Sequence, residues 1–320
     1  MQPWFIWNNI DSRTMNVWVS QLPAPTRAAE RVQEIEIPGR AGTLTIKEGD
    51  DVHEGYVKEC VITVPATADF HALLNWLRGE SQVIFSNEPD RVYFAHMAGQ
   101  VKFDRVGNSL KQATLPIYVH PHKGQYPPEY DIAIDGSETV RNPGNVAAKP
   151  IITLTFVGSC TLTVNGETMM FTKGNETTAQ TIIVDCDAEI VTSDANIWSG
   201  GVEGEFPRLP VGDNTISAAL TVPTWENDKE YTQGHLRVYD GDIYECGITA
   251  RAWVATKEYA SGDYCINNDN LYQANKTTSS SWVAADWDLV GTSTEWIDDL
   301  WTLVAEATVT AILKPRWRWC

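Results

Sequence analysis

Alternating apolar and polar positions dominate the first third of the chain and predict short strands. Apolar, β-branched and aromatic residues gather in short runs, and Gly, Pro or Asn separates one run from the next. Runs of this kind are typical of strands with one buried face. The predicted strands are Ile35–Ile37, Thr43–Ile46, Val57–Val64, Val83–Phe85, Val92–Phe94 and Ala113–Val119.

One segment has the period of a helix instead. Its N-cap is predicted at Thr67 or Asp69, and Gly79 is expected to end it. The face expected to pack on a sheet consists of Phe70, Leu73, Leu74 and Leu77.

A proline-rich stretch at 120–128 predicts a domain boundary. Short strands resume after it, with turns every eight to twelve residues and no convincing helix, which favours a β-sandwich or jelly roll. These strands are predicted at Pro150–Phe156, Cys160–Val164, Thr168–Phe171, Ala179–Val184, Glu189–Val191 and Thr215–Leu220. The predicted fold class is therefore mainly β.

The last third of the chain contains an internal repeat whose members keep one constant offset (253 − 225 = 28). The pairs are Trp225/Trp253, Glu230/Glu258, Tyr231/Tyr259, Gly234/Gly262 and Tyr244/Tyr272. Such a register predicts two copies of one small β unit, at 225–252 and 253–290. Only the second copy is expected to continue, through Trp282 and Trp287–Val290.

The repeat separates two strand-like segments, Asn214–Leu220 and Ala307–Leu313. We expect these segments to pair as a hairpin whose tip carries the repeat, because exposed turns tolerate insertions. Six of the thirteen tryptophans lie in the insertion, at 225, 253, 282, 287, 296 and 301.

The charge balance excludes two classes of partner. The 320 residues hold 24 Lys and Arg against 42 Asp and Glu, a net charge of −18. Binding to nucleic acid or to an anionic membrane needs a basic surface, so neither is expected.

The N-terminus lacks the pattern of a signal peptide, and no apolar run is long enough for a membrane helix, so folding in a cytoplasm is expected. The six cysteines have no metal-ligand spacing. Cys60, Cys160 and Cys186 are expected to be buried free thiols. Cys246 and Cys265 could bridge in a secreted domain but are expected to be reduced in a cytoplasm.

The motifs of common enzymes are missing, and we expect no catalytic residue, no cofactor and no metal. The sequence has no GxSxG, HExxH, P-loop or GxGxxG. His120 and His122 flank a proline and are interpreted as solvated linker residues.

Two charged patterns have alternative interpretations. Asp185, Asp187 and Glu189 would share one face of a strand, as a cation site, a glycosidase carboxylate pair or, as we favour, a solvated face. Arg316 and Arg318 alternate with Trp317 and Trp319, which indicates a terminal strand that buries its tryptophans rather than a site for single-stranded nucleic acid.

Aromatic residues of the repeat are the candidate site, since aromatic rings stack on the apolar faces of sugars. The four that match in register, Trp225, Tyr231, Trp253 and Tyr259, are assigned to the core. The candidate carbohydrate-binding residues are Trp282, Trp287, Tyr264, Tyr272, Tyr239 and Tyr244. Of these, Tyr239, Tyr264, Trp282 and Trp287 are expected to be freest to lie at the surface, and Trp282 is the strongest single candidate.

The chain resembles the distal tail proteins of long-tailed siphophages over about 235 of its 320 residues. The matching segments are Leu22–Pro25, Ile35–Leu44 with its Pro38-Gly39-Arg40 turn, Asn142–Asn145 followed by Ala148–Ile152, and Lys314–Arg318. The resemblance implies an N-terminal β-barrel or belt domain with one helix at 1–125. It also implies a galectin-like sandwich at 126–221 plus 305–320.

The insertion, 222–304, resembles small chitin-type carbohydrate-binding modules. Trp253, Tyr259, Gly262-Asp263, Tyr272–Ala274 and Trp287 match their pattern. The chain has Asn275–Thr278 where such modules often carry exposed tryptophans.

Together the resemblances imply a non-enzymatic homohexamer at the tip of a phage tail, assembled in the cytoplasm of the bacterial host. It would join the tail tube protein to a baseplate hub or tail fibre protein, let DNA pass as cargo, bind no membrane, and present the insertion to cell-wall polysaccharide. The alternative is an extracellular carbohydrate-binding protein or glycosidase accessory module, with Asp185, Asp187 and Glu189 as its site.

Overall fold

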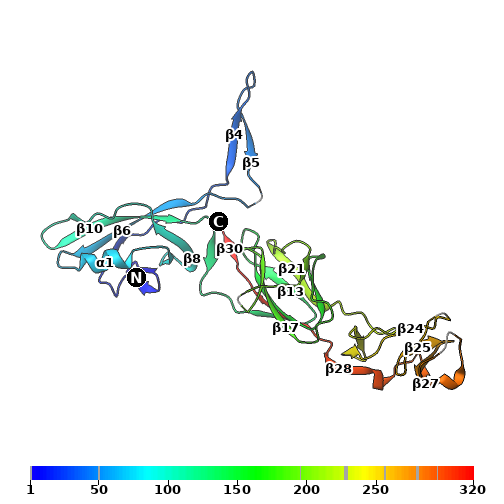
Figure 1. The fold of residues 1–320 in the computed structure, drawn as a ribbon. Helices are drawn as coiled ribbons and strands as arrows, with labels where there is room; N and C mark the ends of the chain where they lie inside the picture. Colours follow the sequence, from blue (N-terminus) through cyan, green and yellow to red (C-terminus); the bar gives the residue numbers. More distant parts are fainter. Residues whose placement is uncertain are drawn as a thin grey trace.

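The computed structural model describes residues 2–49, 51–194, 196–226, 230–255, 257–278, 281–293 and 295–320. These residues form a mainly β fold with one α-helix, α1 (Phe70–Trp76), and two short 3-10 helices. Figure 1 shows an elongated arrangement in which the N-terminal sheet, a sandwich and a group of small sheets follow one another. The predicted fold class is confirmed. None of the described helices is both long enough and apolar enough to traverse a lipid bilayer.

The N-terminal sheet has the strand order β2-β1-β7-β8-β10-β6-β3, with β9, β11 and β30 at its sides. Its strands are β1 (Phe5–Trp7), β2 (Ile10–Asp11), β3 (Trp18–Gln21), β6 (Tyr56–Pro65), β7 (Ser81–Phe85), β8 (Glu88–Met97), β9 (Asp104–Arg105), β10 (Leu110–Val119), β11 (Lys123–Gln125) and β30 (Arg318–Trp319). The order runs between two ends, so the described strands form no closed barrel. Alternate residues of β6 and β10 point into the core, as the sequence pattern predicts.

Helix α1 packs on this sheet through Phe70, Leu73 and Leu77, as predicted, but with Trp76 in place of Leu74. Asp69 caps it, because its carboxylate accepts a hydrogen bond from the Ala72 amide at 3.0 Å. Leu73 is 3% exposed, whereas Leu74 is 43% exposed. Trp76 takes the place expected for Leu74: its indole donates to the Trp7 carbonyl at 3.0 Å, which draws that side of the helix onto the sheet.

Strands β4 (Val32–Glu36) and β5 (Thr43–Lys47) form a hairpin that extends away from the rest of the chain (Figure 1). Every residue of the two strands is exposed. The exposed apolar side chains of this hairpin and the residue after β4 are Val32, Ile35, Ile37, Leu44 and Ile46.

The middle of the chain forms a sandwich of two antiparallel sheets around one core. The six-stranded sheet contains β12 (Ile132–Ile134), β14 (Ile151–Phe156), β17 (Gln180–Asp185), β18 (Ile190–Ser193), β19 (Asn196–Ile197) and β29 (Thr310–Lys314). The five-stranded sheet contains β13 (Ser137–Asn142), β15 (Ser159–Val164), β16 (Glu167–Thr172), β20 (Gly201–Glu203) and β21 (Gly212–Leu220). Leu154 and Ile182 of the first meet Leu162 and Phe171 of the second in the shared core.

The predicted hairpin of 214–220 with 307–313 is wrong. Strand β21 pairs with β13 and β15, whereas β29 pairs with β12 and β14 in the opposite sheet. The segment between them therefore crosses from one sheet to the other. Each of the two strands pairs with strands from residues 132–164 and not with the other, so they lie in different sheets. The domain boundaries drawn from the sequence stay predictions.

The segment between β21 and β29 contains two small sheets. One consists of β22 (Leu236–Tyr239), β23 (Asp242–Cys246) and β28 (Trp301–Glu306), and the other of β24 (Ala250–Ala252), β25 (Tyr264–Asn267), β26 (Asn270–Ala274) and β27 (Trp287–Thr292). The 3-10 helices η1 (Ala284–Asp286) and η2 (Asp298–Leu300) each precede the last strand of one sheet.

All six cysteines are buried and unpaired, Cys246 and Cys265 included. Burial raises the pKa of the Cys60 and Cys160 thiols to about 12, so they are not reactive at neutral pH.

Candidate functional site

The two small sheets repeat one another at the same offset as the sequence repeat. Strand β25 begins and ends at this offset from β22 (264 − 236 = 28), and β26 does so from β23. The turns match as well: Gly234 donates to the Cys246 carbonyl at 2.7 Å, and Gly262 donates to the Ala274 carbonyl at 2.7 Å. We call β22, β23 and β28 with η2 the first module, and β25, β26 and β27 with η1 the second module.

The third strand of each module lies at a different offset, which the sequence reasoning missed. Trp301 pairs with Cys246 in the first module, and Trp287 pairs with Ala274 in the second. The tryptophan of the first module thus follows that of the second along the chain (301 − 287 = 14). The second module is therefore nested within the first, whose chain leaves after β23 and returns at β28. The prediction that only the second copy continues, through Trp282 and Trp287, is wrong, because the first copy continues at Trp301.

A signal in the sequence could have revealed this nesting. The segment Trp296–Val304 repeats Trp282–Val290 with two identical tryptophans, one leucine and one valine in register. The structure matches it closely: Gly247 donates to the Leu300 carbonyl at 2.9 Å, and Asn275 donates to the Asp286 carbonyl at 3.0 Å. In the first two strands, a residue of the first module precedes its counterpart in the second module, whereas in the third strand it follows its counterpart. Nesting of one module within the other produces this reversal at the third strand alone.

Each module holds an aromatic cluster with nearly the same geometry. In the first, Trp296 stacks on Trp301 at 4.8 Å between ring centroids and meets Tyr244 edge-on at 4.9 Å. In the second, Trp282 stacks on Trp287 at 5.1 Å and meets Tyr272 edge-on at 5.0 Å. Trp225 and Trp253 each pack edge-on at 5.7 Å against the tryptophan of their own cluster.

The clusters differ at one position. Tyr239 stacks on Trp296 with 4.0 Å between centroids and 6° between planes. Since Trp301 also stacks on Trp296, the two rings must cover opposite faces of its indole. The position equivalent to Tyr239 in the second module is Asn267, the last residue of β25. Among the described residues, Trp287 is the one ring stacked on Trp282, so the second module lacks the second stacked ring that Tyr239 provides in the first.

The structure brings most of the candidate residues into these clusters, with different roles. Trp282 is half-buried and has one stacked ring, Trp287, among the described residues. Trp287 was expected at the surface but is only 5% exposed, because Tyr259 and Trp282 pack on it. Tyr239, Tyr244 and Tyr272 are half-buried and contact tryptophans.

The remaining candidate, Tyr264, has no ring contact with the tryptophans of either cluster among the described residues and packs on the core that joins the modules. Of the four residues expected in the core, Tyr231 and Tyr259 are buried, at 2% and 3% exposure, whereas Trp225 and Trp253 are half-buried.

The segment that departs from the carbohydrate-binding pattern supports η1 instead. Asn275 donates to the Ala285 carbonyl and to Asp288, both at 3.2 Å, and Lys276 forms an ion pair with Asp286 at 2.7 Å. Thr278 is buried and accepts a hydrogen bond from the Tyr259 amide at 3.1 Å. These contacts fix the turn that carries Trp282 and Trp287.

The acidic residues of the alternative site do not share a strand face. Strand β17 ends at Asp185, and Asp187 and Glu189 lie in the turn that follows, Glu189 with a φ of 55°. Asp185 accepts two hydrogen bonds from Arg316, and Asp187 contacts Arg318 and Lys149.

Burial is the largest single influence and acts to raise the pKa of Asp185 and Asp187, but the hydrogen bonds and nearby cations, first among them Arg316 and Arg318, together outweigh it and the pKa of each is lowered. A glycosidase general acid needs a raised pKa and a free carboxyl group. Asp185 and Asp187 have neither.

Trp317 is buried at 4% exposure, as expected, while Trp319 is half-buried beside Arg91. The interleaved arginines point to Asp185 and Asp187 instead of forming a basic surface.

Comparisons with known proteins agree with the fold. No family model matches the chain, and no curated protein matches it by sequence. Among solved structures, the chain is similar to the SPP1 Dit protein, described as a paradigm of the hub adsorption apparatus in phages that infect Gram-positive bacteria. The TM-score is 0.53 at 15% identity, and the match covers 68% of this chain and 95% of the Dit chain. This likeness shows a shared fold.

Proposed function

We propose that this chain is the distal tail protein of a phage, the hub that joins the tail tube to the baseplate or tail fibre. The observation that carries the proposal is the match to nearly the whole Dit chain, 95% of its length. It agrees with the resemblance seen in the turn at Pro38–Arg40 and in the segments at 142–152 and 314–318. The protein would act in the virion, after assembly in the host cytoplasm.

The proposed assembly is a homohexameric ring. The β4–β5 hairpin supports it, because an isolated two-stranded hairpin is marginally stable in water and this one buries none of its strand residues. A neighbouring copy that covers Ile35, Leu44 and Ile46 would remove apolar surface from water.

The net charge supports a ring through which DNA passes. Six copies would carry −108 (6 × −18). Acidic walls repel DNA, so the cargo would not be held during passage.

Light scattering of the purified chain tests the ring. A hexamer has six times the mass of the 35.6 kDa chain. A mass near this multiple supports the hub, and a monomer at the highest attainable concentration contradicts it. A hairpin variant, Leu44→Asp with Ile46→Asp, should lower the mass, whereas Leu289→Asp on the exposed surface of the second module should not.

We propose in addition that the second module binds cell-wall polysaccharide through Trp282. Its support is the half-buried Trp282 ring, which has a stacked ring on one face alone, from Trp287, and is held by a T-shaped contact with Tyr272. A sugar ring stacks on such a face, and six-fold display would turn weak single sites into strong attachment.

Sedimentation with purified cell walls tests the glycan site. Trp282→Ala should reduce binding at least about tenfold in a six-fold array. Tyr130→Ala, an aromatic truncation at a residue 93% exposed and far from the modules in sequence, should leave binding unchanged. Equal binding by all three proteins, or by none, contradicts the glycan site but not the ring. A monomer that binds walls through Trp282 would favour the extracellular carbohydrate-binding alternative.

A further inference from the structure

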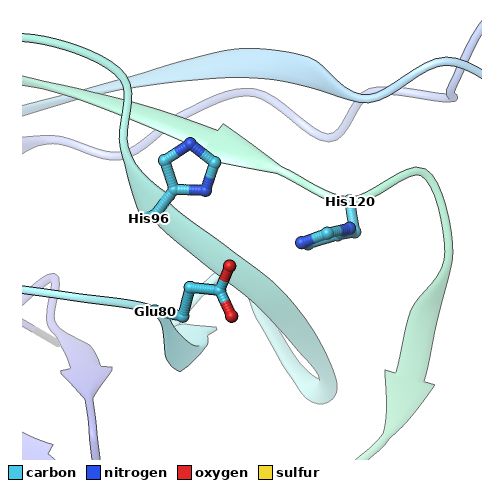
Figure 2. Close-up of side chains that lie close together, drawn as sticks. All are labelled: Glu80, His96 and His120. Atoms are coloured by element: carbon cyan, nitrogen blue, oxygen red, sulfur yellow. The ribbon is translucent and has the colours of Figure 1, made fainter.

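Three ligand-type side chains converge on the outer face of the N-terminal sheet, away from the modules. Glu80 lies directly before β7, His96 in β8 and His120 directly after β10 (Figure 2). Their ligand atoms all lie within 4.8 Å of one another.

Strand register explains the convergence. Ser81 pairs with Ala95, so the preceding Glu80 lies across from His96. His96 pairs with Tyr118, and His120, two positions further along, points to the same face as Tyr118. The three side chains thus come from β8 and from the residues that flank its two neighbours, β7 and β10.

The packing around the cluster leaves one of its polar atoms unsatisfied: the Nδ1 atom of His96 is buried without a hydrogen-bond partner. Glu80 has no ion pair or hydrogen bond among the described residues. The Tyr118 ring lies 4.9 Å from the His96 ring and 6.0 Å from the His120 ring, which limits the rotation of both imidazoles. Gly55 makes room for this tyrosine, since a Cβ there would clash with its hydroxyl oxygen.

We propose that Glu80, His96 and His120 bind a divalent metal ion of the zinc class. Two imidazoles and one carboxylate form a common zinc ligand set, with a fourth position left for water. Zinc–ligand bonds of about 2.0–2.2 Å place tetrahedral ligand atoms roughly 3.3 Å apart, so the cluster must contract. It can do so because Glu80 and His120 are exposed and only His96 is fixed by packing.

The ion would join strands that are weakly held together at this point. Strands β8 and β10 pair at only three positions, from Ala95–Val119 to Met97–Ile117. A ligand from each strand, with a third from the start of β7, would fasten this end of the sheet.

The expectation that His120 and His122 are solvated holds for the exposed His120 but not for His122. His122 is half-buried against His53, with 5.5 Å between ring centroids. His120 belongs with His96 instead, a pairing that their wide separation along the chain does not suggest.

Zinc titration of the full chain, freed of any polyhistidine tag and treated with chelator, tests the site. We expect one Zn²⁺ per chain by calorimetry, and Co²⁺ should give the visible absorption bands of a four-coordinate ion. His120→Ala and Glu80→Ala should each weaken Zn²⁺ binding at least about tenfold. Both side chains are exposed, so the variants are expected to fold, which equal melting temperatures without metal would verify.

His71→Ala, an exposed histidine on α1, is the matched control and should bind Zn²⁺ as the wild type does. The proposal is overturned if the wild type shows no saturable Zn²⁺ binding, or if His120→Ala and Glu80→Ala bind as well as the control. It is equally overturned if His122→Ala removes the binding and His120→Ala does not.

Discussion

Arg316 donates two hydrogen bonds to Asp185, each 3.0 Å long, and so joins the C-terminal segment to the end of β17, 131 residues earlier. Arg318 repeats the contact with Asp187 at 2.7 Å. The two charged patterns that the sequence presents as separate candidate sites are therefore partners. Their purpose is structural, because bidentate arginine–carboxylate pairs fix geometry as well as charge.

Asp185→Ala should lower the free energy of unfolding of the sandwich by about 1–3 kcal/mol, since it removes charged hydrogen bonds at a partly buried site. Arg316→Lys should have a similar effect, because an ammonium group cannot reproduce the two parallel bonds. Urea denaturation measures both. Asp135→Ala, at an exposed residue of the same sandwich, is the control and should change stability by less than about 0.5 kcal/mol.

Acid should weaken the same contacts. The folded-state pKa of Asp185 and of Asp187 is lowered, so their contribution is complete above their unfolded pKa of about 3.9 and is lost as the pH falls through the lowered values. The stability difference between the wild type and Asp185→Asn/Asp187→Asn should be constant above about pH 5 and shrink below about pH 4. A difference that persists unchanged at the acid end would contradict this assignment.

Much of the strand pattern could be predicted from sequence, because one buried face imposes alternation. Asp69 likewise marked the start of the helix correctly. Which distant segments of the chain pair as strands could not be predicted. Alternation in 214–220 and 307–313 shows that each is a strand, but not that they lie in opposite sheets.

Whether a functional residue could be found from the sequence also depended on how far along the chain its partners lie. Trp282 was chosen because it has no counterpart at the offset of the repeat, and its true counterpart, Trp296, was missed because the nested module places it after Trp282 in the chain. Glu80, His96 and His120 meet only through strand register, which no local pattern encodes.

Adjacent leucines on α1 should respond very differently to truncation. Leu73→Ala should cost about 2–5 kcal/mol, since Leu73 is 3% exposed, whereas Leu74→Ala should cost less than about 1 kcal/mol at 43% exposure. Thermal unfolding of the two variants distinguishes the observed helix face from the predicted one. Equal losses would indicate that both leucines are buried.

Glu88 should be essential for the stability of the N-terminal sheet. It lies 3.0 Å from Lys123 and 3.8 Å from Lys58, both nearly buried. Burial lowers the pKa of Lys58 to about 8 despite the carboxylate. Glu88→Gln leaves two ammonium groups uncompensated and should cost about 3–5 kcal/mol at neutral pH.

The loss caused by Glu88→Gln should shrink as the pH rises through about 8, because Lys58 then gives up its charge. Glu30→Gln, which breaks an exposed pair with Lys47, is the control and should cost less than about 1 kcal/mol.

The position occupied by Tyr239 in the first module and Asn267 in the second should decide which tryptophan face is open. Asn267→Tyr places a ring where Tyr239 covers Trp296, so it should shield Trp282 and reduce cell-wall binding without loss of folding. Tyr239→Asn should have the opposite effect on Trp296 and increase fluorescence quenching by acrylamide. The quenching result tests the geometry even where no wall binds. If Asn267→Tyr leaves wall binding intact while Trp282→Ala abolishes it, the sugar does not stack on the face of Trp282 that lies opposite Trp287.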